Sequence, residues 1–218
     1  MSFDNLISGA KTYFPELQVK YKDSSLLMKI IGTIMFFSPS FMSNYITTIG
    51  NTIYIPNQNY ITSRPVSAAV VFMHEVVHLY DHRRLGTFWF QLSYVMPQIF
   101  ALPALLLFLL SWKIALPVVL FFLLPLPSYF RMKYERRAYY ASIYIIQKLS
   151  EKLNFDPHLE SQNTYFVECF ADSTYYFMWP FSSIIADDFT TARQLVQAGK
   201  RPYEDPVFDI LDDLVTKV

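Results

Sequence analysis

The amino-acid sequence predicts a mainly α-helical fold with a small β-hairpin or sheet, an α+β arrangement. Several segments repeat their apolar residues at helical spacing, which is typical of helices that pack on a common core. Two short β-branched runs flank Gly50 and Asn51, a pair that favours the two-residue turn of a hairpin. Residues 95–130 contain a single charge. This stretch divides the chain into a first part, residues 1–94, and a last part, residues 131–218.

The first expected element is a helix within residues 24–37 (SSLLMKIIGTIMFF). Ser24 or Ser25 can cap it, and the preceding residues, 1–23, are mixed and polar with Pro15 among them. A lysine and a glycine interrupt the apolar run, which is shorter than the roughly 18 residues of a membrane span. We therefore expect a core or interfacial helix, and a short membrane-facing helix is the alternative.

Two strands and a long helix follow. The runs at 46–49 (ITTI) and 52–55 (TIYI) form the two arms of the expected hairpin. After them, Ser63 and Pro65 are typical of a helix start, and a basic pair followed by Gly86 is typical of a helix end. The sequence thus predicts a helix of about 20 residues between these signals.

The middle of this helix carries the pentapeptide HEVVH, from His74 to His78. Two imidazoles four positions apart lie about 5 to 6 Å apart on one helix face, so both can bind one ion, and Glu75 lies beside them. This arrangement predicts a catalytic zinc site in which Glu75 takes a proton from the attacking water. The chain has four His and seven Glu, so chance predicts only roughly 0.002 such motifs. The alternative, surface histidines on an ordinary helix, fits poorly with the apolar neighbours of the motif.

A catalytic zinc ion keeps three protein ligands and leaves one position for water, so a third ligand must come from elsewhere. His82 lies about 12 Å along the helix from His74, too far to share the ion, and a helix-end role suits it better. Glu135 and Glu168 remain as candidates. Each is followed three residues later by alanine, a small side chain that lets its helix approach the motif helix closely.

The apolar stretch 95–130 has Lys113 as its only charge. It divides at residues 111–113 into two arms of about 16 or 17 residues, each roughly 25 Å long as a helix. A bilayer core of about 30 Å needs about 20 residues, so we expect a tilted or re-entrant membrane hairpin. Its prolines would kink it: Pro97, Pro103, Pro117, Pro125 and Pro127. The alternatives are a helical hairpin buried in a soluble protein, and a soluble enzyme whose stretch docks on a partner.

Charges and the cysteine count set the expected location and partners. Basic residues flank the stretch on both sides, so both of its ends, and the catalytic part, are expected on the cytoplasmic side of the membrane. Cys169 is the only cysteine, and residues 1–14 lack a signal-peptide pattern, so a reducing compartment is expected. With 18 basic and 18 acidic residues, the chain has no net charge to attract nucleic acid. The expected partners are a lipid bilayer and a peptide or protein substrate, without nucleic acid.

Further helices are expected after the stretch. Their ranges are 134–153, 165–178, 183–198 and 207–217, with a linker at 200–206. A break at 154–157 and Gly199 separate them.

HEVVH together with the later Glu-x-x-Ala-Asp, from Glu168 to Asp172, resembles the gluzincins, a class of zinc metallopeptidases. The apolar hairpin between them resembles the membrane branch of that class, the HtpX and CAAX-protease type, and the resemblance covers roughly residues 45–150. It implies a zincin-like catalytic core with an inserted membrane-associated hairpin. It also implies a ligand glutamate on the helix just after that hairpin, which favours Glu135.

The resemblance further implies an aspartate, four residues after the ligand, that orients the first histidine. Asp172 follows Glu168 in this way, whereas Tyr139 follows Glu135. Tyr139, Asp172 and Asp81 all remain candidates for this orienting role.

From the motif and the resemblance we expect a membrane-associated zinc metalloendopeptidase. The expected metal ligands are His74, His78 and Glu135, with Glu168 as the alternative third ligand. Glu75 is the expected general base. The resemblance also implies that the strand at 52–55 offers its edge to an extended substrate. The alternative function is a catalytically inactive membrane-bound scaffold or adaptor, in which zinc only holds two helices together.

Overall fold

The computed structural model describes residues 2–35, 38–172 and 177–218. The chain is 69% helical, and a mixed sheet of three strands is the only sheet in these ranges. The strands are β1 (Gln18–Tyr21), β2 (Thr47–Ile49) and β3 (Thr52–Ile55). The expected mainly α fold with a small sheet is therefore confirmed.

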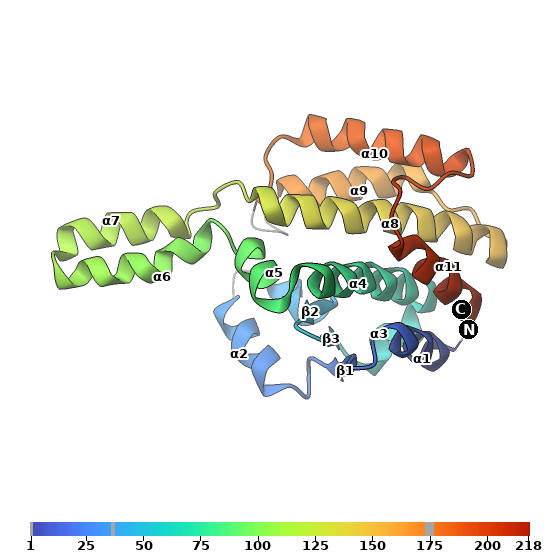
Figure 1. Ribbon diagram of the computed structural model, residues 1–218, viewed down its shortest axis with the longest axis horizontal. Coiled ribbons are helices and arrows are strands. Elements are labelled where there is room, and N and C mark those ends of the chain that lie inside the picture. Colours follow the sequence, from blue (N-terminus) through green and yellow to red (C-terminus); the bar gives the residue numbers. More distant parts are fainter. Residues whose placement is uncertain (1, 36–37, 173–176) are drawn as a thin grey trace.

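The helices form layers around one central helix. They are α1 (Phe3–Tyr13), α2 (Leu26–Ile34), α3 (Gln58–Ser63), α4 (Pro65–Leu85), α5 (Thr87–Tyr94), α6 (Ala101–Ala104), α7 (Trp112–Leu123), α8 (Tyr129–Leu153), α9 (Leu159–Ala171), α10 (Ser182–Gln197) and α11 (Val207–Lys217), with short 3-10 helices η1 (Pro39–Phe41), η2 (Gln98–Phe100) and η3 (Leu105–Leu109). In Figure 1 the sheet lies below α4 with α1, α2 and α3, and α8, α9 and α10 lie above it. The predicted motif helix is thus the middle layer of the molecule.

The predicted hairpin is confirmed, but its place in the sheet is not as expected. β2 and β3 pair antiparallel, with Thr48 opposite Ile53, and Gly50 in their turn has a φ of 57° that glycine adopts without steric cost. β1 pairs parallel with β3, so β3 is the central strand. The sequence analysis does not identify β1, because its polar–apolar alternation, QVKY, covers only four residues within a mixed, polar segment. The expectation that 52–55 offers a free edge is therefore wrong, and β2 is the edge strand that contacts α4.

α4 begins and ends where the sequence predicts. Pro65 is its first residue, and Gly86, with a φ of 83°, follows its last. The helix packs between β2 and α8, so apolar residues occur on nearly every face, and Phe72, Met73 and Val76 are fully buried. Because the HEVVH pentapeptide is buried with them, its polar side chains depend on partners within the protein.

α8 extends the predicted helix at 134–153 toward the hairpin by about one turn. It ends at Asn154, whose φ of 56° is left-handed and closes the helix. Ala138 is fully buried, and α8 packs closely against α4 as the small residue predicts.

An ion-pair network fixes α8 on α4 beside the pentapeptide. Arg137 of α8 lies 3.2 Å from Asp81 of α4 and 2.8 Å from Asp205 of the final linker. Burial raises the pKa of the Asp81 carboxyl, and Arg137 opposes this rise. Breaking such a buried pair is strongly destabilising, so the two helices are held in one relative position.

The last helices follow the prediction except at α9. α10 and α11 match the ranges 183–198 and 207–217 to within a residue. The sequence predicts a helix at 165–178, whereas α9 both begins and ends earlier. The Trp179 amide donates to the carbonyl of Phe170 at 2.9 Å, so the chain has turned back by that point. Residues 173–176 of the predicted range lie outside the described residues.

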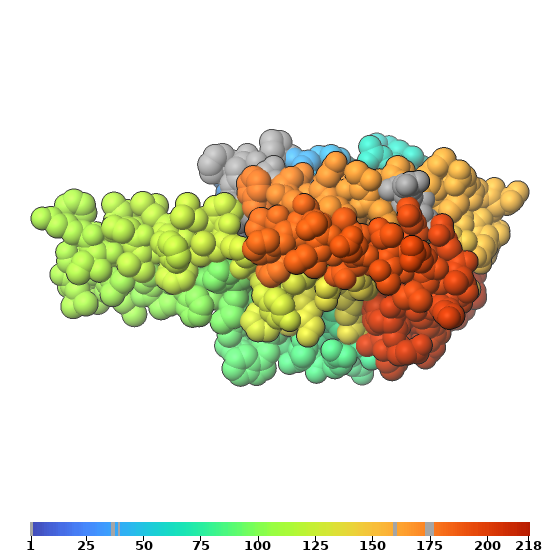
Figure 2. Space-filling view, turned by 90° about the horizontal axis from the view of Figure 1, so that it is seen from above, coloured from blue at the N-terminus to red at the C-terminus, as the bar shows by residue number. Residues whose placement is uncertain are grey.

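Residues 98–123 form a helical hairpin that projects from the rest of the molecule (Figures 1 and 2). The first arm is Gln98–Leu109, the second is α7, and Ser111 caps α7 between them, so the predicted division at 111–113 is confirmed. The second arm has 12 residues rather than 16 or 17, because the chain leaves the helical conformation after Leu123. The first arm is shortened by a bend of 91° between α5 and Gln98–Leu109.

The hairpin exposes its apolar side chains. At its tip, Leu109 is 85% exposed and Leu110 is 80% exposed. The alternative of a hairpin buried within the protein is therefore wrong. No single helix of the described ranges is long and apolar enough to cross a membrane, although the bent pair Thr87–Tyr94 and Gln98–Leu109 has the length and composition of one span.

α2 confirms the helix expected within residues 24–37, and Ser25 caps it by accepting from the amide of Met28. Phe36 and Phe37 of that range lie outside the described residues. Only Met28 of α2 is buried, whereas several apolar residues are exposed: Leu26, Leu27, Ile30 and Ile34. α2 is therefore not a core helix, and it lies at the end of the molecule from which the hairpin projects (Figure 1).

Candidate metal centre

Three side chains from two helices meet beside the sheet: His74 and His78 of α4, and Glu135 of α8. Nε2 of His74 lies 3.4 Å from Oε2 of Glu135, and Nε2 of His78 lies 3.6 Å from Oε1 of Glu135. One ligand atom from each residue lies within 4.8 Å of the other two, and all three residues are buried. The structure thus brings together the three residues that the sequence predicts as metal ligands.

The spacing of these atoms fits a zinc ion. In a tetrahedral site with zinc bonds of about 2.0 to 2.1 Å, neighbouring ligand atoms lie about 3.3 to 3.4 Å apart, close to the 3.4 Å between Nε2 of His74 and Oε2 of Glu135. Oε2 of Glu135 is buried and accepts no hydrogen bond from any described residue. A buried carboxylate oxygen without a donor is costly unless a cation meets it. The residues present therefore suit a zinc ion held between them.

Glu168, the alternative third ligand, is not part of this cluster. Its side chain is exposed on α9, and Asp172, at the end of α9, is exposed as well. The histidines lie against α8, so the residue that reaches them is Glu135.

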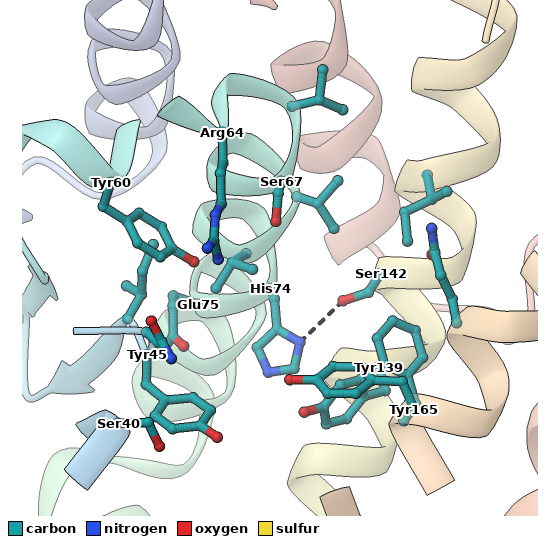
Figure 3. A pocket seen from close by; sticks show the side chains of 18 of the residues that line it. Ser40, Tyr45, Tyr60, Arg64, Ser67, His74, Glu75, Tyr139, Ser142 and Tyr165 are labelled. Carbon is teal, nitrogen blue, oxygen red and sulfur yellow. Dashed lines mark hydrogen bonds between the residues drawn. The ribbon is translucent and has the colours of Figure 1, made fainter. Parts of the chain in front are cut away.

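Ser142 of α8 holds the ring of the first histidine. Its Oγ lies 3.0 Å from Nδ1 of His74 (Figure 3) and donates its own hydrogen to the Ala138 carbonyl at 3.1 Å. A hydroxyl that already donates to the helix can accept from Nδ1–H of His74. Nε2 is then left unprotonated and directed at Glu135, which is the form of imidazole that binds a metal.

The residues that the sequence offers for this orienting role lie elsewhere or act differently. Tyr139 packs its ring edge-on against His74, with centroids 4.8 Å apart. Asp81 is paired with Arg137, and Asp172 is exposed at the end of α9. The orienting role therefore belongs to Ser142.

We expect Ser142→Ala to weaken zinc binding about 10- to 100-fold, because the ring of His74 loses the acceptor that fixes its tautomer and direction. Ser150→Ala is the matched control, since Ser150 is also buried on α8 and also donates to a helix carbonyl, that of Gln147. Competition with a zinc-chelating dye measures both affinities. Equal affinities in the two variants would exclude an orienting role for Ser142.

Tyr94, the last residue of α5, fixes the carboxylate of Glu135. Its Oη donates a hydrogen bond to Oε1 of Glu135, and its ring packs edge-on against His78 with centroids 6.3 Å apart. One oxygen of the carboxylate is thus held by a neutral donor, and the other is left for a cation.

Glu75 lies beside this cluster but contacts the sheet instead. Its carboxylate is buried, and Thr48 of β2 donates to Oε2 of Glu75 at 2.6 Å. The edge strand therefore fixes the direction of the residue that the sequence predicts as general base.

Without a metal, His78 and Glu135 form a buried ion pair. Burial lowers the pKa of His78, but the Glu135 carboxylate outweighs burial and raises this pKa to about 9. Burial also favours a higher pKa for Glu135, but the charge of His78 outweighs burial and holds that pKa well below its usual range. His78 therefore carries a proton at neutral pH that a metal ion must displace.

The sequence analysis does not identify Ser142, Thr48 or Tyr94. A signal exists for Ser142, because it lies seven residues after Glu135 and so two turns along the same helix face. Thr48 and Tyr94 have no such signal, since their contacts arise only when the sheet and α5 pack against α4 and α8.

Two cavities meet at Glu75. One has a volume of about 730 Å³ and lies on the His74 side (Figure 3), and the other has about 330 Å³ and lies on the His78 side. Glu75, Tyr45 and Ile46 line both cavities. An extended chain that occupied both would therefore pass Glu75.

Comparisons with protein-family models, with curated proteins and with solved structures find no match to this chain. No family is therefore assigned, and the proposals below are supported by the residues and their geometry.

Proposed function

We propose that this protein is a membrane-associated zinc metalloendopeptidase with a zincin-like core. In this proposal the zinc ligands are His74, His78 and Glu135, and Glu75 is the general base. The bound ion would polarise a peptide carbonyl and make a water molecule more acidic. The observation that carries the proposal is the position of Glu75, a buried carboxylate that is fixed by Thr48 next to the ligands and lines both cavities.

The number of ligands also supports catalysis. Structural zinc sites are closed by four protein ligands, whereas catalytic sites keep three and an open position. The cluster contains three ligand residues among the described parts of the chain. A purely structural site would need neither the adjacent carboxylate nor the cavities.

The chain's own groups can carry out the proton transfers of peptide hydrolysis. Glu75 can take a proton from the attacking water and later deliver it to the leaving amine. Thr48 keeps the carboxylate in one direction during both transfers. β2, the edge strand, lines the smaller cavity, so an extended substrate can add to the sheet there by backbone hydrogen bonds.

Purified protein supplied with zinc should therefore hydrolyse unfolded casein or a mixture of synthetic peptides. A strong chelator should abolish the hydrolysis, because the ligands lose their ion, and added zinc should restore it. Appearance of new amino termini measures the reaction. A folded protein that binds one zinc ion and cleaves neither substrate would instead support the alternative, an inactive scaffold with a structural zinc.

We further propose that the hairpin enters a lipid bilayer while the catalytic part stays on the cytoplasmic side. Exposed apolar residues gather at the same end of the molecule, where Phe88 and Trp89 of α5 are 67% and 65% exposed beside the hairpin and α2 (Figure 1). Tryptophan at this position is typical of a membrane interface, and basic residues on both sides of the stretch favour the cytoplasmic side.

The double substitution Leu109→Asp and Leu110→Asp should lower partitioning into phosphatidylcholine and phosphatidylglycerol vesicles at least about tenfold. Each aspartate places a charge where the hairpin tip would meet hydrocarbon, and about 1.4 kcal/mol is enough for a tenfold change. Leu153→Asp is the matched control, because Leu153 is 40% exposed at the other end of α8, away from the hairpin. Flotation measures partitioning. If the double variant and Leu153→Asp both bind vesicles as strongly as wild type, insertion of the hairpin tip is excluded.

A further inference from the structure

The larger cavity has a mostly aromatic and aliphatic lining with one positive charge. Six aromatic side chains line it: Tyr45, Tyr60, Tyr139, Phe155, Tyr165 and Phe166. Arg64 is the only lysine or arginine among its lining residues, and the only acid there is Glu75. The cavity therefore suits an apolar segment that also carries a negative charge.

The guanidinium of Arg64 is available for a ligand. It is exposed and forms no hydrogen bond or ion pair with any residue in the described ranges, and its charge acts on the nearby Tyr60 hydroxyl. Figure 3 shows its side chain pointing into the cavity toward Glu75, with the hydroxyl of Tyr60 beside it. Arg64 also lies at the N-terminus of α4, a helix of 21 residues, where the helix dipole adds positive potential.

The direction of the edge strand predicts which part of a substrate reaches Arg64. Asn44 lines only the larger cavity, whereas β2 lines only the smaller one, so this segment runs from the larger cavity to the smaller. A substrate paired antiparallel to β2 runs the opposite way and places its C-terminal part in the larger cavity. Antiparallel pairs outnumber parallel ones roughly two- to three-fold. The charge of Arg64 also favours this substrate direction, because a substrate that ran the other way would bring its positive α-amino group toward the positive guanidinium.

The length of α4 limits the distance between the cleaved bond and the charge. Arg64 precedes Glu75 by 11 positions, which is about 16 Å along the helix axis. An extended peptide covers that distance in about five residues. The side chain of Arg64 points back toward Glu75, so five residues is an upper bound.

We propose that Arg64 is a specificity-determining residue that binds a substrate carboxylate within about five residues on the C-terminal side of the cleaved bond. This inference rests on the proposed peptidase function and names the substrate class of the same site. The carboxylate is either the free C-terminus of the substrate or the side chain of an aspartate or glutamate. Both present the same bidentate partner to a guanidinium.

The first test maps cleavage in random-sequence synthetic peptides, made once with free C-termini and once amidated. Zinc-loaded wild type should cut where a carboxylate lies within five residues after the cleaved bond. Loss of cleavage on amidation of peptides without acidic side chains would identify the C-terminal carboxylate, and retained cleavage before acidic residues would identify a side chain. Acidic residues enriched only before the cut bond would overturn the inferred direction.

Arg64→Gln should lower kcat/KM for the carboxylate-bearing peptides about 10- to 100-fold, because a charge-assisted hydrogen bond is lost. Cleavage of neutral peptides should change less than about threefold. Arg64→Glu should shift the preference toward peptides with lysine or arginine at the same positions. Arg193→Gln, which removes an arginine that does not line this cavity, is the matched control. An equal loss for charged and neutral peptides in Arg64→Gln would overturn the inference.

A binding measurement separates this inference from the peptidase proposal. The probes carry the uncharged dansyl label: Ala-Ala-Phe-Ala-Ala as free acid and as amide, and Ala-Ala-Phe-Asp-Ala as amide, each titrated with the protein carrying Glu75→Gln. Preference for a carboxylate probe that disappears with Arg64→Gln would support the inference even if wild type cleaves no peptide. Cleavage of peptides without any carboxylate preference would overturn the inference and leave the peptidase proposal standing. Equal binding of all three probes together with absent cleavage would overturn both.

Discussion

Glu75→Gln is expected to lower kcat/KM for peptide hydrolysis by about 10²- to 10⁴-fold while zinc stays bound. Glutamine has nearly the shape of glutamate, and its amide oxygen can still accept the hydrogen bond from Thr48. It cannot accept the proton of the attacking water, so only the chemical step loses its base. Because Glu75 is not among the three clustered ligand residues, the zinc content should remain one ion per chain.

Zinc analysis and peptide-hydrolysis kinetics on the same preparation test whether Glu75 acts as the base without supporting the metal site. Glu151→Gln is the matched control, since Glu151 is an exposed glutamate of α8 whose one hydrogen bond within the described residues is with Gln147 of the same helix. This control should keep kcat/KM within about twofold, because Glu151 lines neither cavity and surface substitutions usually change stability by less than about 0.5 kcal/mol. Full activity in Glu75→Gln would exclude Glu75 as the base. Loss of zinc together with activity would show instead that Glu75 supports the metal site.

The parts of this fold that the sequence predicts are those whose signals are local. Gly50 and Asn51 place the hairpin turn, and Pro65 and Gly86 place the ends of α4, because each residue type has a backbone preference of its own. The spacing within HEVVH likewise follows from the helix repeat alone. These features can therefore be predicted without knowing which elements pack against them.

The features that the sequence does not predict depend on long-range packing. β1 is a strand that pairs with β3, and its own alternation, QVKY, is too short to predict it from the sequence. Because of this parallel pairing, β3 is the central strand of the sheet, and the edge strand of the hairpin is β2. Thr48 contacts Glu75 only because β2 lies against α4.

The choice between Glu135 and Glu168 as third ligand shows most clearly where prediction from the sequence alone ends. The letters after Glu168 fit the pattern of the resembled class better, yet the structure brings Glu135 to the histidines. Sequence position after the hairpin favours Glu135, and the packing of α8 on α4 provides the physical reason. Nδ1 of His74 contacts Ser142, three residues beyond Tyr139, and this contact depends on how α8 packs against α4.

Glu135→Ala is expected to remove zinc, whereas Glu168→Ala should leave zinc binding unchanged. The first variant deletes one of three ligands, so its loss of affinity should exceed the 10- to 100-fold typical of residues that only support a ligand. The second changes an exposed side chain on α9. Glu135→Gln serves as a second variant, because its amide oxygen can keep the hydrogen bond from Tyr94 and so preserve the packing of α5. Zinc retained by both Glu135 variants and lost from Glu168→Ala would reverse the ligand assignment.

The pH dependence of zinc binding tests the same cluster independently. In the metal-free protein the pKa of His78 is raised to about 9, so below that pH a proton must leave when zinc binds. Wild-type affinity should therefore rise about tenfold per pH unit between pH 6 and 8, with about one proton released per zinc. Glu135→Gln removes the carboxylate that raises the pKa of His78. In the zinc binding that this variant retains, the number of protons released per zinc ion at pH 7 should therefore fall well below one. Calorimetry in two buffers of different protonation enthalpy measures the release. Zinc binding to wild type at pH 7 without proton release would show that His78 is neutral there, and the ion pair with Glu135 would then not exist in solution.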